Sequence, residues 1–269
     1  MTTLIGKKVL AFNYFGGKYQ YLEELYLNFP EHFHFVDLMC GSMAVTLNKT
    51  PSKMDTANDL DGDVVNFFRT LRVDPEGLYQ AIYLTPVARE EYNSCFPINL
   101  PGASDIERAR RFYVRCKMSF QGAGLKQHTG FNACVATSEK GMSKNVTKFI
   151  STLEKLPEII ERLKTIQIES LDYRDMLKKY DRPDTFFYVD FPYELKTRNY
   201  KKWYNHEFSD ADHIEAAGHL QKINGKAMVS GYESKLYRDL YKNWRKVKLR
   251  PRGHAMSADK KQEVIWMNY

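Results

Sequence analysis

Strand-like runs that alternate with helical segments constrain this 269-residue chain more than any other feature. Four apolar runs are short and rich in β-branched or aromatic residues, and most are bounded by glycine, proline or aspartate, as buried strands are. They are residues 33–38, 185–189, 226–230 and 263–267. Between them, residues 149–163 and 210–223 have apolar side chains at helical spacing, with a break expected near Pro157 and a cap at Ser209. This alternation predicts an α/β domain with a mainly parallel sheet.

The composition excludes several classes of protein. Hydrophobic residues make up 43% of the chain and charged residues 27%, which is typical of globular domains. No apolar run is long enough to span a membrane, and we expect no secretory signal. The four cysteines are far apart, which favours reduced thiols over disulfides or a metal site. The net charge of +7 favours a polyanionic partner, although a solvated basic surface explains it equally well.

The middle of the chain differs from both ends. Residues 74–148 contain few strand-like runs, and small polar residues are scattered there among basic and aromatic ones. Five cations fall within ten residues, namely Arg108, Arg110, Arg111, Arg115 and Lys117. We therefore expect an insertion over residues 74–148 between two parts, 1–73 and 149–269, of one α/β domain.

Two segments follow strand-like runs at positions where α/β sheets bind ligands. Asp190–Tyr193 comes directly after the run 185–189, and Asp37–Val45 leads from another run through Gly41 into a helix. Asp59 follows about 20 residues later, where an acidic residue holds ribose hydroxyls in nucleoside-binding sheets. Each pattern alone also fits an ordinary turn or helix cap. The loop Tyr14–Lys18, with its two glycines, is uninformative in isolation.

In this order, however, the segments resemble the Dam-like (D12 class) family of N6-adenine-specific DNA methyltransferases. Tyr14–Lys18 is similar to the family's aromatic-x-Gly-Gly-Lys opening, and Asp37–Met43 partly matches its Gly-rich motif. Asn58–Asp61 matches its second motif, and Asp190–Tyr193 approximates its Asp-Pro-Pro-Tyr motif. Phe120–Gly122 looks like the Phe-Asn-Gly of its recognition segment.

The resemblance implies a Rossmann-like methyltransferase sheet with a mainly helical target-recognition insertion. It implies S-adenosylmethionine as the cofactor, double-stranded DNA as the partner and methylation of the adenine N6 amine after base flipping. It also implies a monomer in the cytoplasm of a bacterial or phage-infected cell, whether in a restriction–modification system, a phage or alone. The cofactor-binding residues would be Tyr14, Gly17, Lys18, Asp37, Met39, Cys40, Gly41, Ser42, Asp59, Asp172 and Asp190.

The catalytic residues implied are Asp190, Phe191, Pro192 and Tyr193. An exocyclic amine is a poor nucleophile because its lone pair is delocalised into the ring. If Asp190 and the Phe191 carbonyl accept its N–H bonds, the nitrogen can pyramidalise, and Asp190 stabilises the developing positive charge. The Tyr193 ring would stack on the extruded base and offset part of the cost of unstacking.

Departures from the family pattern leave alternatives open. Phe191 replaces a proline, and Met43 replaces a glycine, where it is expected to narrow the space beside the cofactor. One alternative is an impaired relative that binds DNA or cofactor without turnover. Another is a methyltransferase for a different amino acceptor, such as cytosine N4 or an RNA base.

Basic residues gather again between Tyr241 and Lys261, where eight cations face one acid. A solvated basic loop is the ordinary explanation, but beside a base-flipping motif the run predicts contacts with phosphates. The DNA-binding residues expected from both basic regions are Arg115, Lys117, Phe120, Gln121, Lys126, Arg250 and Arg252.

Overall fold

The computed structural model describes residues 6–14, 16–119, 128–138, 141–197, 207–251 and 262–269. Within them, one sheet has seven strands in the order β3-β2-β1-β4-β5-β7-β6. The strands are β1 (His34–Asp37), β2 (Met54–Asn58), β3 (Ile166–Glu169), β4 (Thr185–Val189), β5 (Lys226–Tyr232), β6 (Arg245–Lys248) and β7 (Glu263–Met267). The first five in this order are parallel, and β7 is antiparallel to both neighbours. This confirms the α/β fold with a mainly parallel sheet.

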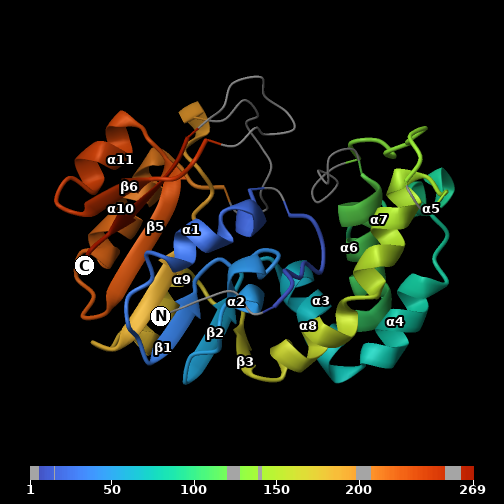
Figure 1. The fold of residues 1–269 in the computed structure, drawn as a ribbon, viewed down its shortest axis with the longest axis horizontal. Coiled ribbons are helices and arrows are strands. Elements are labelled where there is room, and N and C mark those ends of the chain that lie inside the picture. Colours follow the sequence, from blue (N-terminus) through green and yellow to red (C-terminus); the bar gives the residue numbers. More distant parts are fainter. Residues whose placement is uncertain (1–5, 15, 120–127, 139–140, 198–206, 252–261) are drawn as a thin grey trace.

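Helices cover both faces of the sheet, and a further group lies to one side (Figure 1). The α-helices are α1 (Leu22–Tyr26), α2 (Ala44–Asn48), α3 (Gly62–Val73), α4 (Pro75–Tyr83), α5 (Arg89–Ser94), α6 (Asp105–Met118), α7 (Lys144–Leu153), α8 (Leu156–Leu163), α9 (Tyr173–Tyr180), α10 (Asp210–Leu220) and α11 (Lys235–Leu240). Helix α1 packs on one face of the sheet, and α9, α10 and α11 pack on the other. Helices α3 to α8 form the group at the side.

Strand β4 lies at the centre of this arrangement, and all five of its residues are buried. Its side chains alternate between the two faces, as a strand requires. Phe186 and Tyr188 contribute to the core beneath α1, whereas Phe187 and Val189 contribute to the core beneath α9 and α10. Because helices cover both faces of the sheet at this central strand, nearly every residue of the strand must be apolar.

The four strands expected from the sequence are present as β1, β4, β5 and β7. The expected break near Pro157 is also present, because α7 ends at Leu153 and Pro157 lies in the first turn of α8. Ser209 caps α10 by accepting a hydrogen bond from the Asp212 backbone N–H at 3.2 Å.

Strands β2, β3 and β6 have no apolar pattern that the sequence analysis identifies. In β2, Asp55 is buried because Lys49 and Arg162 neutralise it, with nitrogen–oxygen distances of 2.6 and 2.5 Å. In β6, three of four residues are Lys or Arg, and the strand pairs only with β7 at the edge of the sheet. Ion pairing in β2 and an edge position in β6 replace a continuous apolar run, whereas β3 still contributes Ile166 to the core.

The group of helices at the side shares a core with the rest of the chain. Phe112 of α6 packs on Phe12 and Phe67, with ring centroids 4.9 and 6.0 Å apart. Helix α7 spans the boundary expected at residue 148. Whether residues 74–148 form a separate unit stays a prediction.

Arg115 of α6 is fully buried, with 1% of its side chain exposed, and its Nη2 lies 2.8 Å from the Asp63 carboxylate. Removing one partner of a buried ion pair is strongly destabilising. We expect Arg115→Ala to lower the free energy of unfolding by about 3 kcal/mol, measured by urea denaturation. The control is Arg69→Ala, whose exposed pair with Asp105 contributes at most about 1 kcal/mol. Equal losses in the two variants would contradict the structural role of Arg115.

Candidate active site

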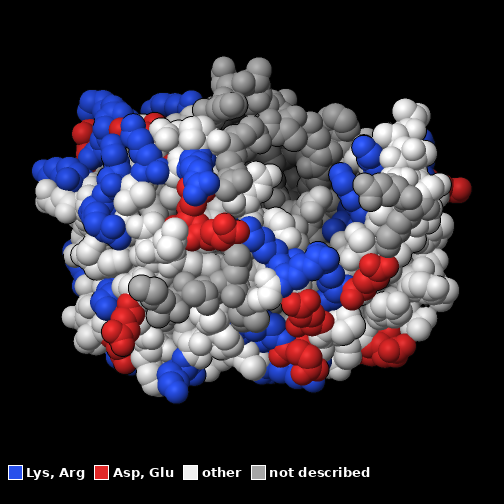
Figure 2. Space-filling view, viewed as in Figure 1, with Lys and Arg blue, Asp and Glu red and all other residues white. Residues whose placement is uncertain are grey.

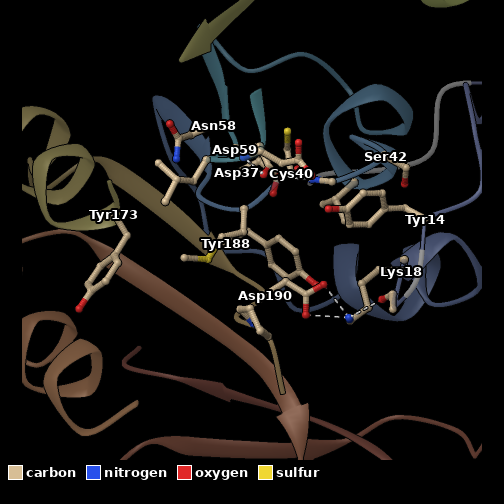
Figure 3. A pocket seen from close by; sticks show the side chains of 18 of the residues that line it. Tyr14, Lys18, Asp37, Cys40, Ser42, Asn58, Asp59, Tyr173, Tyr188 and Asp190 are labelled. Carbon is tan, nitrogen blue, oxygen red and sulfur yellow. Dashed lines mark hydrogen bonds and ion pairs between the residues drawn. The ribbon is translucent and has the colours of Figure 1, made fainter. Parts of the chain in front are cut away.

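A cavity of about 260 Å³ opens at the carboxyl ends of β1, β2 and β4 (Figure 3). Strand order reverses between β1 and β4, and ligands bind at such a switch point in open α/β sheets. The residues expected to bind a cofactor all line it, namely Tyr14, Gly17, Lys18, Asp37, Met39, Cys40, Gly41, Ser42, Asp59, Asp172 and Asp190. That these residues bind a cofactor remains a prediction.

The turn after β1 is held in place by a carboxylate. Gly41 has a φ of +48°, and a Cβ atom there would lie 2.8 Å from the Tyr14 ring. The Asp59 carboxylate accepts hydrogen bonds from the backbone N–H groups of Gly41 at 2.8 Å and Asp61 at 2.9 Å. Burial raises the pKa of Asp59 to about 6. Asp59 therefore positions the turn, in addition to any contact with a ribose.

Asn58, next to Asp59, joins the ends of three strands. Its amide nitrogen donates to the carbonyls of Leu38 and Leu171, both at 3.0 Å, and its oxygen accepts the Leu171 backbone N–H at 2.8 Å. These bonds explain an asparagine at this position without any ligand.

Asp37 and Asp190 are the carboxylates nearest to the reversal between β1 and β4. Asp37 accepts a hydrogen bond from the Thr46 hydroxyl at 2.7 Å, and burial raises its pKa to about 7. Asp190 lies 2.6 Å from the Lys18 ammonium and accepts a hydrogen bond from the Ser230 hydroxyl at 2.8 Å. Figure 3 shows the Lys18 and Asp190 side chains pointing toward each other.

Tyr193 is placed differently from the sequence expectation. It does not line the cavity, its side chain is buried, and its hydroxyl donates to Glu263. The Lys18 ammonium lies 4.9 Å from the centroid of its ring, and Tyr232 packs edge-on at 4.7 Å. In this conformation Lys18 covers a ring face on which a base was expected to stack.

Phe191 lies behind the cavity wall, whereas Pro192 lines it. Only 1% of Phe191 is exposed. Its ring stacks on Phe208 with centroids 4.8 Å apart and meets Tyr173 edge-on at 5.6 Å. Because Phe208 and Tyr173 both line the cavity, Phe191 supports this wall.

Met43 does not narrow the cavity, contrary to the expectation. Its side chain is fully buried in the core with Phe12 and Leu47. It precedes α2 with a φ of +55°, in the left-handed region where glycine is favoured. The substitution therefore strains the backbone rather than filling the site.

The residues expected to bind DNA separate into four groups. Arg115 is buried against Asp63, so the expectation that it contacts phosphates is wrong for this conformation. Lys117 is partly buried, its ammonium donates to Thr152 at 2.7 Å, and burial lowers its pKa to about 8. Arg250 is exposed. Phe120, Gln121, Lys126 and Arg252 lie outside the described residues.

Exposed cations gather near Arg250 over β6 and α11 (Figure 2). They are Lys235, Arg238, Lys242, Arg245, Lys246 and Lys248. Glu233 pairs with Lys246 at 2.9 Å and lies 3.6 Å from both Arg238 and Lys248, so it neutralises only part of this charge.

Sequence reasoning assigned no role to several residues at the site. Glu263, Ser230 and Thr46 contact Lys18, Asp190 and Asp37, respectively. Glu263 had a recognisable signal, because it is a charged residue that opens an otherwise apolar strand. Thr46 is a small polar residue within an apolar stretch, and its sequence gives no comparable signal.

A doubly wound sheet with carboxylates in a cavity at its switch point is an architecture of nucleotide-binding α/β enzymes. Residues 14–256 match the model of the D12 class N6 adenine-specific DNA methyltransferase family. The chain belongs to this family and is an adenine-specific DNA methyltransferase. Within the described residues, we find no helix with the length and apolar character needed to cross a membrane.

The raised pKa of Asp37 predicts a pH-dependent stability. The folded state favours the protonated carboxyl of Asp37. Its contribution to the free energy of unfolding is therefore fully present below about pH 4 and is lost as the pH rises through about 7. Between pH 4 and 8, the free energy of unfolding should fall by about 3 kcal/mol more in the wild type than in Asp37→Asn. The amide oxygen of the substituted side chain can still accept the Thr46 hydrogen bond. Urea denaturation across this range measures the difference.

The control for this pH series is Asp105→Asn, which neutralises an exposed carboxylate. Its pH dependence should follow that of the wild type. If Asp37→Asn does the same, Asp37 is ionised throughout and the expected shift is absent.

The packing of Phe191 predicts that restoring the family's proline is harmful here. Phe191→Pro removes the ring that supports Phe208 and Tyr173, and losing a buried aromatic side chain costs about 3–5 kcal/mol. We expect a lower free energy of unfolding and weaker cofactor binding by calorimetry. Phe191→Leu keeps most of the apolar volume, so it should lose less stability and less cofactor affinity than Phe191→Pro. A proline variant as stable as the wild type would show that Phe191 has no supporting role.

Proposed function

We propose that the protein transfers a methyl group from S-adenosylmethionine to the N6 amine of an adenine flipped out of duplex DNA. The observation that carries this proposal is the position of Asp190. Its carboxylate lies at the edge of the switch-point cavity, 18% exposed and next to the residues assigned to the cofactor.

The cavity residues fit this cofactor. Met39, Leu60 and Leu171 offer apolar surface, whereas Asp59 and Asp61 offer carboxylates suited to ribose hydroxyls. The cavity is close to the lower end of the range for small-molecule sites, about 300–1,000 Å³. S-adenosylmethionine supplies an electrophilic methyl group on a sulfonium centre.

Asp190 and the main-chain carbonyl of Phe191 would accept the two N–H bonds of the target amine. The amine lone pair is then free to face the methyl group, and the carboxylate opposes the positive charge that develops on nitrogen. Because Ser230 donates to Asp190, the carboxylate orientation is set before the amine arrives. This preorganisation avoids part of the cost of reorienting the group during reaction.

Duplex DNA is the proposed substrate because exposed cations gather over β6 and α11. Neutralising phosphates releases bound counterions, which favours association. We infer that Arg250 and its basic neighbours contact the backbone of the duplex. This basic surface does not distinguish adenine from cytosine or an RNA base as the methyl acceptor. The methylated product must therefore be identified chemically.

Transfer of a tritiated methyl group from labelled S-adenosylmethionine to duplex DNA, followed by nucleoside analysis, tests the proposal. We expect N6-methyladenine as the product. Asp190→Ala should lower the transfer rate by at least about 100-fold, while cofactor binding measured by calorimetry remains detectable. N4-methylcytosine as the product, binding of both ligands without transfer by the wild type, or an active Asp190→Ala variant would each contradict the proposal.

A further inference from the structure

Lys18 occupies the place that the proposed function assigns to the target base. Its ammonium lies 2.6 and 2.7 Å from the two Asp190 oxygens and 4.9 Å from the centroid of the Tyr193 ring. It therefore hydrogen bonds with the carboxylate that would hold the amine and covers a face of the ring that would stack on the base. The target base cannot make the same contacts while Lys18 stays there.

A second carboxylate lies within reach of the same ammonium. Glu263, the first residue of β7, is 2% exposed, and its Oε1 is 3.7 Å from the Lys18 nitrogen. Its carboxylate accepts a hydrogen bond from the Tyr193 hydroxyl. Lys18 is 3% exposed, so an ammonium that left Asp190 without another anion would be a buried unpaired charge. Glu263 removes that penalty.

We propose that Glu263 is a positioning residue that receives the Lys18 ammonium when the target adenine enters, and thereby frees Asp190 for the adenine amine. The inference rests on the proposed role of Asp190. Glu263 lies beyond residues 14–256, which match the family model. No bond is made or broken in this step, because one ammonium exchanges hydrogen bonds between two carboxylates.

The protonation state of Glu263 controls this exchange. Burial raises the pKa of Glu263 to about 7, although Lys18 opposes that effect. Burial lowers the pKa of Lys18, but Asp190 and Glu263 raise it more, so Lys18 stays charged. The titratable groups that face Glu263 among the described residues are Lys18, Asp190, Tyr188, Tyr193, Tyr232 and Tyr237. A neutral Glu263 cannot neutralise Lys18, so acid should slow transfer.

The test compares Glu263→Gln with the wild type in single-turnover methyl transfer from pH 5.5 to 9. In the wild type, the rate should rise with pH, reach half of its maximum at about pH 7 and then level off. In Glu263→Gln, the rate at pH 8 should be lower by about 100-fold, and the rise near pH 7 should be absent. Cofactor affinity by calorimetry should stay within twofold of the wild type, which shows an intact fold.

Three further variants separate positioning from packing. Tyr193→Phe removes the hydroxyl bond to Glu263 but keeps the carboxylate, so its rate should still rise near pH 7. Glu263→Asp restores the charge and should recover part of the rate and its pH dependence. Glu161→Gln neutralises a carboxylate with 71% of its side chain exposed and should match the wild type.

Two outcomes overturn the inference. If Glu263→Gln keeps the wild-type rate and pH profile, Glu263 does not receive Lys18, although the proposed function stands. If the wild type itself transfers no methyl group to duplex DNA, the proposed function fails, and this inference fails with it.

Discussion

Strands β1 and β4 are parallel neighbours at the reversal of strand order, and the cavity depends on this arrangement. The chain turns away from the two carboxyl ends in opposite directions, which leaves a crevice between the loops. Asp37 ends β1 and Asp190 follows β4, so the fold brings both carboxylates to the crevice.

The crevice gathers carboxyl groups whose ionisation the protein only partly supports with cations. Asp37, Asp59 and Glu263 are buried, and burial raises the pKa of each. Two cations line the cavity in the described structure: Lys18 pairs most closely with Asp190, and Arg174 pairs with Asp172 and Glu215. Such a site favours a ligand that brings positive charge, and a sulfonium cofactor meets that requirement.

The sequence predicts the fold well because its apolar runs correspond to strands buried on both sides. It also predicts most of the cavity, because residues that end parallel strands must share one edge of the sheet. It fails where a side chain's role depends on a distant partner. The burial of Arg115 depends on Asp63, which lies 52 residues earlier, and Tyr193 is covered by Lys18. Spacing along the chain contains no information about such pairs.

Met43 is a second residue whose structural role the sequence does not predict. A methionine in place of a glycine suggests a change in the volume of the site, but its side chain points into the core. The substitution instead strains the backbone, because Met43 has a positive φ. Side-chain direction at a turn is fixed by dihedral angles that a motif comparison does not provide.

The pairing of Arg115 with Asp63 also limits how this protein can diversify. In the sequence, α6 is followed closely by Phe120–Gly122, which resembles part of a recognition segment, yet the buried face of α6 packs against α3. Exchange of residues 74–148 between relatives would separate Arg115 from Asp63 and Phe112 from Phe67. An exchange that begins after Ser119 would keep these contacts. Substitutions in α6 must therefore remain compatible with α3, whatever sequence follows Ser119.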